Sequence, residues 1–210
     1  MTILALEFSS ERRSVALARD GVLLAEAAEV GGRATNALGL IEKVLTESKN
    51  VHAEIAAIAV GLGPGSYTGI RAAIAVAQGW QLARGIKLLG VNSVDAIAAQ
   101  AQAEQFFGRV NVVVDAQRDE FYLATWEISS AACREVSPLK IVTAAEMEKR
   151  RVGGEMFAGP ETGRILFPSA AMVARLAAGR ADFVSGENLE PVYLRLTNFI
   201  KAPAGRGIII

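Results

Sequence analysis

The chain opens with three apolar segments whose order restricts the fold more than any other feature. Thr2–Phe8, Ser14–Arg19 and Val22–Val30 have the apolar and β-branched composition of strands. Asp20-Gly21 joins the second to the third and is a strong hairpin signal, because two-residue hairpin turns favour residues that accept a positive φ. We therefore predict an antiparallel meander at the N-terminus.

Helices and strands alternate after this meander. Apolar residues recur at helical spacing over Thr35–Ser48, which predicts an amphipathic helix. Ile55–Leu62 is a continuous apolar run, as expected of a buried strand. Past a glycine-rich stretch, the pattern predicts a helix over Gly69–Arg84 that ends at Gly85, the strand "KLLGV", and a further helix over Val94–Gln105.

The second half of the chain begins as the first does. Val110–Ala116 has the pattern of a buried strand, "QRDE" that of a polar turn and Phe121–Ile128 that of an alternating strand. Fewer elements are predicted after it: helices over Ala144–Arg151 and Ser169–Ala178, and a short strand at Met156–Ala158. The final "GRGIII" is left unassigned, since a strand at a sheet edge, a partner contact and a disordered end all fit it.

This element order predicts an α/β chain with two lobes, residues 1–106 and a smaller lobe of related topology over 107–210. A Rossmann fold alternates helix and strand from the start, whereas three antiparallel strands followed by alternation match the ribonuclease-H-like lobe of actin, sugar kinases and heat-shock ATPases. We expect a two-lobed actin-like (ASKHA) fold with mixed sheets and flanking helices.

Composition excludes several classes of function. The 22 basic side chains balance 22 acidic ones, so no net field attracts nucleic acid or an anionic membrane, and we expect another chain to grip any RNA. One cysteine, Cys133, cannot form an internal disulfide, which fits a reducing compartment. No run reaches the roughly 18 apolar residues of a membrane span, and no signal peptide is evident, so we expect a cytoplasmic protein.

The stretch "GLGPGSYTGIRA" raises three chemical hypotheses, and it departs from each motif. A P-loop needs Gly-Lys at its end, and here Gly69 is followed by Ile70 and Arg71. A dinucleotide fingerprint needs a glycine where Thr68 stands, and a nucleophile elbow needs glycines on both flanks of Ser66. A tight turn that opens a helix is the better interpretation.

Few side chains are suited to catalysis. A serine triad would need the single histidine, His52, which lies in the polar link "SKNVHAE" and has the setting of a solvated residue. One histidine and one cysteine leave no set of soft ligands for zinc. We therefore assign no catalytic residue and no metal ligand, although carboxylates could still hold magnesium.

Two carboxylates stand where a nucleotide site would need them. Glu7 and Asp115 close the first strand of each lobe, where actin-like ATPases hold the metal and phosphates, and a vestigial nucleotide site would comprise Glu7, Ser9, Ser10 and Asp115. A polar residue at a strand end explains each equally well. Glu7 is also one methylene longer than aspartate, which is unfavourable for near-ideal magnesium geometry.

The helix predicted after the glycine stretch carries small side chains along neighbouring faces. They let another backbone approach closely, and Trp80 offers a large anchor. Packing against the chain's own sheet explains one face, and a partner helix in a dimer would explain the other. The small residues are Gly69, Ala72, Ala73, Val76, Ala77 and Gly79.

Four segments resemble the bacterial TsaB (YeaZ) family: "ILALEFSSERRSVAL", "GLGPGSYTGIRAAIAVAQG", "VDAQRDEFY" and "EPVYLR". The resemblance implies an actin-like fold and a role in forming threonylcarbamoyladenosine beside the anticodon of tRNAs that read codons beginning with A. It implies a non-catalytic partner and activator of the catalytic homologue TsaD, with the ATPase TsaE in the same system. ATP, ADP and metal are then expected on partner subunits, and none on this chain alone.

The resemblance also suggests a partner or dimer contact through the two long N-terminal helices. A homodimer is expected for the isolated chain, and Arg71 is suited to a phosphate contact at the junction with a partner. The family usually has Asp-Thr-Ser where this chain has Glu7-Phe8-Ser9, and often a histidine where it has Ala34. The expected contact residues are Leu38, Ile41, Ser66, Tyr67, Thr68, Arg71, Ala73 and Ala77.

Two other functions compete with this one. A free-standing ATPase or small-molecule kinase of the actin-like fold would use the carboxylates and serines of the vestigial site to hold magnesium-ATP. A glycoprotease, a label that relatives with this fold have carried, is disfavoured because neither a zinc pair nor a serine triad can be assembled.

Overall fold

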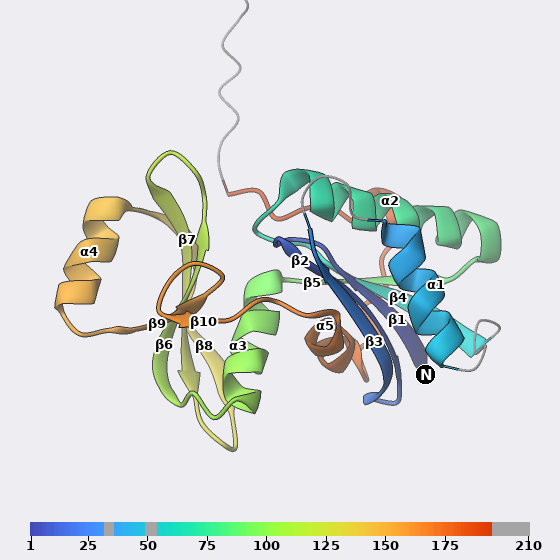
Figure 1. Cartoon of the computed structure of the whole chain (residues 1–210), viewed down its shortest axis with the longest axis horizontal. Coiled ribbons are helices and arrows are strands. Elements are labelled where there is room, and N and C mark those ends of the chain that lie inside the picture. Colours follow the sequence, from blue (N-terminus) through green and yellow to red (C-terminus); the bar gives the residue numbers. More distant parts are fainter. Residues whose placement is uncertain (32–35, 49–53, 195–210) are drawn as a thin grey trace, which may run out of the picture.

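The computed structural model describes residues 1–31, 36–48 and 54–194, which form two sheets with helices packed on them (Figure 1). The first sheet has the strand order β3-β2-β1-β4-β5, and the second has the order β10-β9-β6-β7-β8. The predicted α/β class, with mixed sheets and flanking helices, is confirmed.

The first sheet contains the predicted meander. β1 pairs antiparallel with β2, and β2 with β3, while β1 pairs in parallel with β4, and β4 with β5. Asp20 and Gly21 both have positive φ in the turn between β2 and β3, as the hairpin signal predicts. The strands are β1 Thr2–Glu7, β2 Arg12–Arg19, β3 Val22–Val30, β4 Ile55–Gly61 and β5 Lys87–Val91.

The second sheet repeats this pattern with β6 in the place of β1. β6 pairs antiparallel with β7 and β7 with β8, while β6 pairs in parallel with β9 and β9 with β10. The sequence pattern does not predict β8, an edge strand with a single buried residue and Pro138 in its centre. The strands are β6 Gly108–Asp115, β7 Glu120–Ile128, β8 Cys133–Thr143, β9 Met156–Gly159 and β10 Arg164–Ile165.

Helices α1 (Ala37–Glu47) and α2 (Tyr67–Arg84) cover one face of the first sheet. Ser66 caps the N-terminus of α2, with its Oγ accepting from Gly69 N, and the left-handed Gly85 ends the helix as predicted. The predicted start of α1 at Thr35 falls outside the described residues; α1 begins at Ala37 with Asn36 as its cap.

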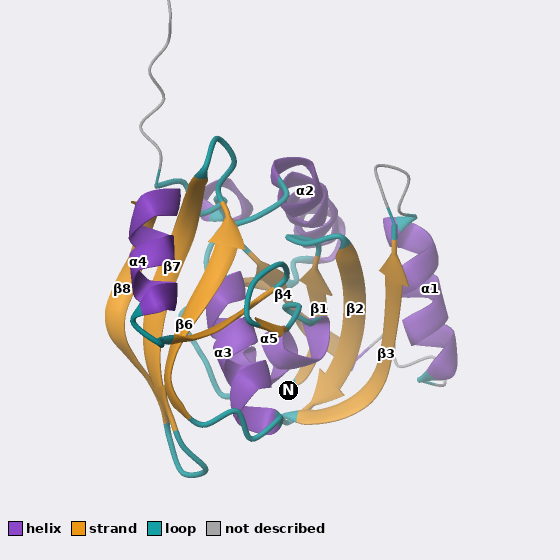
Figure 2. Cartoon of the chain, turned by 60° about the vertical axis from the view of Figure 1, so that its left-hand side comes forward, coloured by secondary structure: helices purple, strands orange, loops and turns teal. Residues whose placement is uncertain are grey.

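Two helices connect the two halves of the chain. Helix α5 (Ala170–Ala177) follows the second sheet in sequence yet packs on the other face of the first sheet, and α3 (Ser93–Ala103) packs on the second sheet (Figure 2). Helix α4 (Ala144–Val152) lies outermost on the second sheet, and a 3-10 turn occupies Gly186–Asn188. A lobe boundary at residue 106 stays a prediction, because α3 and α5 each pack on the sheet of the other half.

Candidate functional site

The glycine loop, residues 62–66, lies on the end of β1. The backbone N–H of Ser66 donates to the carbonyl oxygen of Ser9 at 2.6 Å. A Cβ added at Gly65 would lie 2.1 Å from that same oxygen, and one added at Gly69 would lie 2.0 Å from the carbonyl oxygen of Phe8. These two glycines therefore permit close backbone contact within the chain. Contact with the chain's own backbone explains these glycines of "GLGPGSYTGIRA" without a phosphate ligand.

Glu7 is turned inward beneath this loop. Its side chain is fully buried; Oε1 accepts from the backbone N–H of Ser9 at 2.7 Å and Oε2 from the hydroxyl of Ser93 at 2.8 Å. Burial raises the pKa of the Glu7 carboxyl, and the hydrogen bonds from Ser9 and Ser93 oppose that shift. The proposed assignment of Glu7 to a nucleotide site is therefore corrected, because its carboxylate does not line the cavity between the lobes.

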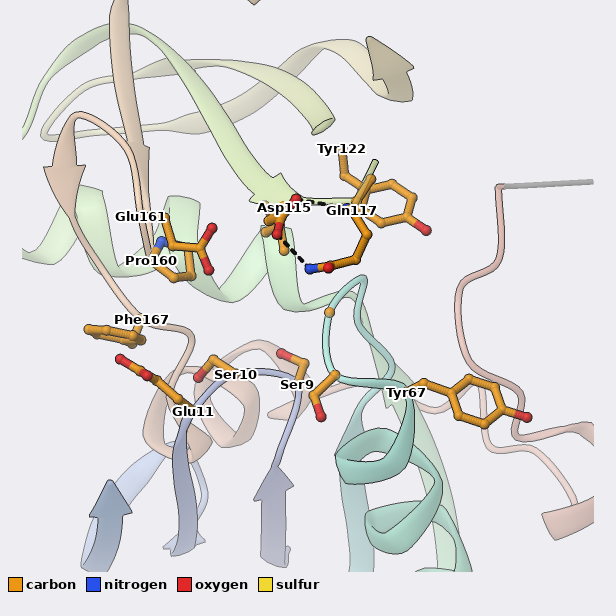
Figure 3. A pocket seen from close by; sticks show the side chains of 14 residues that line it. Ser9, Ser10, Glu11, Tyr67, Asp115, Gln117, Tyr122, Pro160, Glu161 and Phe167 are labelled. Carbon is orange, nitrogen blue, oxygen red and sulfur yellow. Dashed lines mark hydrogen bonds between the residues drawn. The ribbon is translucent and has the colours of Figure 1, made fainter. Parts of the chain in front are cut away.

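That cavity has a volume of about 470 Å³ and lies between the glycine loop and the second sheet (Figure 3). Figure 3 shows Ser9, Ser10 and Tyr67 on its first-lobe side and Asp115, Glu161 and Tyr122 on its second-lobe side. The structure thus brings three of the four residues of the vestigial site together. The lining residues are Ser9, Ser10, Glu11, Gly65, Ser66, Tyr67, Val114, Asp115, Ala116, Gln117, Tyr122, Pro160, Glu161 and Phe167.

The charge of the lining is entirely acidic. Glu11, Asp115 and Glu161 line the cavity, and the lining set contains no lysine, arginine or histidine. Burial raises the pKa of Glu161, and the neighbouring charges of Asp115 and Glu11 raise it further. The carboxylate of Asp115 already accepts from the backbone N–H and the Nε2 of Gln117 at 2.7 and 2.6 Å.

This chemistry does not fit a magnesium nucleotide. Nucleotide phosphates would meet three carboxylates without a cationic side chain to pair with them. Within residues 1–31, 36–48 and 54–194, no group of three or more His, Cys, Asp or Glu side chains is arranged to hold a metal ion. We therefore assign no reaction step to a nucleotide in this cavity.

A second candidate site lies at the start of α2. We call Ser66, Tyr67, Thr68 and Arg71 the docking edge. Tyr67 is 54% exposed, and Arg71 Nη1 donates to its hydroxyl at 2.7 Å with the guanidinium 5.2 Å from the ring centroid. Arg71 does not line the cavity, and a phosphate contact by this residue stays a prediction.

The C-terminal segment adds Tyr193 to this edge, a contact that the sequence does not predict. The Tyr193 ring lies 5.8 Å from the Tyr67 ring, and Val192 N donates to the carbonyl oxygen of Leu62 at 2.9 Å. Tyr193 falls in "EPVYLR", a segment quoted for the family resemblance, but no pattern within it indicated which part of the fold it contacts.

The remaining predicted contact residues fall into two groups, one with an exposed side chain and one with buried side chains. Leu38 on α1 is 66% exposed and available to a partner. Ile41, Ala73 and Ala77 are at most 4% exposed, because they pack between their helices and the first sheet. Their assignment to a partner contact is corrected: these side chains belong to the chain's own core. Ala72 and Gly79 form the exposed small-residue face of α2.

Fold and cavity together define a two-lobed α/β protein of the actin-like class whose cleft does not suit the nucleotide typical of that class. The model of the TsaD family, tRNA N6-adenosine threonylcarbamoyltransferase, matches residues 28–184. The chain belongs to this family and, within it, to the TsaB (YeaZ) proteins.

Solved and curated relatives agree with this membership. A crystal structure from Pseudomonas aeruginosa, of an uncharacterized protein with similarity to peptidase YeaZ, has a TM-score of 0.78 at 30% identity, covering 92% of this chain and 99% of that one. The Escherichia coli tRNA threonylcarbamoyladenosine biosynthesis protein TsaB is 29% identical over 93% of this chain and 95% of its own length. Its Bacillus subtilis namesake is 27% identical over 77% and 72%.

Other predictions fall outside these observations. His52, Ala34 and the "GRGIII" end lie outside the described residues. Among the helices that the structure describes, none has the length and apolar character to cross a membrane.

Proposed function

We propose that this chain is a non-catalytic partner and activator of a TsaD-type enzyme that forms threonylcarbamoyladenosine next to the anticodon of tRNAs reading codons that begin with A. The names of the curated relatives support the pathway. The structural observation that carries the non-catalytic role is the all-acidic cavity in the place of a nucleotide site. Bound ATP, ADP and metal are accordingly proposed for the partner subunits.

The docking edge and the exposed part of α1 are the proposed contact with the TsaD-type partner. Tyr67 and Arg71 are residue types that dominate protein interfaces, since they combine a large apolar area with a polar or charged end. The exposed Leu38 on α1 and the small side chains of α2 would let a partner helix approach. The same surface would form a homodimer when the chain is isolated.

The other proposed members of the assembly are an ATPase and the tRNA substrate. A TsaE-type ATPase is proposed to act on the complex, and tRNA is proposed to bind through the complex, because the chain carries no net charge. The proposed compartment is the cytoplasm. A free-standing ATPase or kinase is the weaker candidate, because Glu7 is buried away from the cavity and the cavity lining lacks a cation.

Reconstitution tests the proposal. Threonylcarbamoyl transfer to tRNA is measured with the cognate TsaD-type enzyme, the TsaE-type ATPase and the synthase, with and without this chain. We expect transfer to depend on the chain, and equal transfer in its absence would refute the proposed role. ATP turnover by the purified chain alone is the accompanying control, and turnover above background would favour the free-standing ATPase.

A further inference from the structure

A buried polar cluster beneath the glycine loop has no part in the contact proposed above. We infer that Glu7 and Ser93 are positioning residues, which hold the glycine loop so that the docking edge is preformed for its partner. This inference rests on the proposed function, because it concerns the same surface. We call Glu7, Ser93, Gly61 and Gly63 the loop latch.

Ser93 holds Gly63 through both backbone groups of the glycine. Its Oγ accepts from the Gly63 N–H at 3.0 Å, and its own N–H donates to the Gly63 carbonyl oxygen at 2.8 Å. The same hydroxyl donates to Glu7 Oε2 at 2.8 Å, which fixes the direction of its proton. Ser93 is fully buried, so water cannot replace these partners in the folded chain.

Glu7 fits a space that the chain leaves free for it. A Cβ on Gly61 would lie 1.9 Å from Glu7 Oε2, so any other residue at position 61 would displace the carboxylate. The opposite oxygen accepts from Ser9 N, whose residue also supplies the carbonyl that binds Ser66 N. The carboxylate therefore contacts both the strand end and, through Ser93, the loop that lies on it.

The latch also connects two elements that belong to different sheets or pack on them. Glu7 ends β1 in the first sheet, whereas Ser93 is the first residue of α3, whose apolar side chains pack on β6 of the second sheet. The glycine loop lies between these two elements and leads directly into the docking edge. A loop held from both sides costs less conformational entropy to order when a partner binds, which is the physical basis of the inferred role.

The test uses Ser93→Ala and Glu7→Gln, with Ser10→Ala as the matched control. Ser10 lies near Glu7 on the same segment, but its hydroxyl donates to the Arg12 carbonyl and not to a residue of the loop. Glu7→Gln keeps the side-chain shape, so the variant should fold. Hydrogen exchange at the Gly63 amide reports the loop, and calorimetric affinity for the TsaD-type partner reports the docking edge.

We expect exchange at Gly63 to accelerate about tenfold or more in both variants. Ser93→Ala removes the acceptor of the Gly63 N–H, and Glu7→Gln replaces one of the two carboxylate oxygens that accept from Ser9 and Ser93. Partner affinity should fall about tenfold in both, and the double variant should lose less than the product because the residues act together. Ser10→Ala should match the natural chain in both measurements.

Unchanged partner affinity in folded Ser93→Ala and Glu7→Gln would overturn the inference and leave the cluster a purely stabilising role. Exchange at Gly63 as slow as in the natural chain would overturn it as well. Failure of the natural chain to bind the partner would refute the proposed function instead, and exchange at Gly63 would still decide whether the latch holds the loop.

Discussion

The last residues of β1 and β6 hold equivalent positions in two sheets of the same strand order, and both are carboxylates. Glu7 at the end of β1 is fully buried and bonded to Ser9 and Ser93. Asp115 at the end of β6 is half-buried, lines the cavity and bonds to its own turn through Gln117. Equivalent positions have thus acquired different roles.

The difference comes from what covers each strand end. In the first lobe the glycine loop after β4 covers the end of β1, where Gly65 and Gly69 lie close to the carbonyl groups of Ser9 and Phe8. In the second lobe Pro160 and Glu161 follow β9 and line the cavity beside Asp115. Two sheets of the same strand order therefore use the same position differently: one carboxylate is a buried support and the other faces the cleft.

Removing each of the two carboxylates should give the largest difference in the free energy of unfolding. We expect Glu7→Ala to lower the free energy of unfolding by about 3 kcal/mol, because it leaves a cavity and buried donors without acceptors. Asp115→Ala should cost about 1 kcal/mol, because its turn is half-exposed. Urea unfolding measures both, and equal losses would contradict the different roles assigned to the two strand ends.

A substitution in the loop should break its contact with β1. Gly65→Ala is expected to cost about 2 kcal/mol, because the added Cβ would meet the Ser9 carbonyl oxygen at 2.1 Å. Gly79→Ala on the exposed face of α2 is the control, since no atom lies within 4 Å of its added Cβ and alanine favours a helix by up to about 1 kcal/mol. Thermal unfolding should therefore shift in opposite directions. A Gly65→Ala chain as stable as the natural one would rule out the close contact.

The pH dependence of stability should separate Glu7 from a non-titrating side chain. Burial raises the pKa of Glu7 above its ordinary value of 4.5, so the folded chain binds the proton more tightly than the unfolded chain. The unfolding free energy of the natural chain relative to Glu7→Gln should then be greatest below pH 4.5 and fall as pH rises through the raised pKa. A difference that grows with pH would mean that the carboxylate is stabilised in its charged form.

The smallest effect is expected at the cavity. Burial and the charges of Asp115 and Glu11 raise the pKa of Glu161, so Glu161→Gln should relieve repulsion and slightly raise stability at pH 7. The gain should stay below about 0.5 kcal/mol because the side chain is mostly exposed. Glu148→Gln is the control; it loses an ion pair with Arg151 at 3.6 Å and should not gain stability. A loss of stability in Glu161→Gln would indicate a cationic neighbour.

Local patterns predicted most elements of the fold because hydrophobic period and turn chemistry act over a few residues. The hairpin at Asp20-Gly21 and the end of α2 at Gly85 follow from positive-φ positions that the sequence marks directly. The strand Cys133–Thr143 was missed because an edge strand buries little and tolerates proline, so its sequence lacks the apolar signal.

The site was less predictable because it depends on contacts between distant segments. Strand alternation places Glu7 on the same face as Ile3 and Ala5, but nothing local indicates that Ser93, 86 residues further on, would bond to it. The helical spacing of small residues likewise does not show which face of α2 meets the sheet. Ala73 and Ala77 are therefore predicted as partner contacts, whereas the structure buries them. The contact of Tyr193 with Tyr67 has the same long-range origin.

The most direct test asks whether the docking edge or the cavity carries the function. It measures threonylcarbamoyl transfer in the reconstituted system for Arg71→Glu and Asp115→Asn. Arg71→Glu should lower transfer about tenfold, because it reverses a charge at the partner contact, and Arg151→Glu on α4 should serve as the unaffected charge-reversal control. Asp115→Asn should stay within about twofold of the natural chain, because the acidic cavity has no cationic side chain to hold a nucleotide and takes no part in the proposed function. Loss of transfer in Asp115→Asn with full transfer in Arg71→Glu would contradict the account.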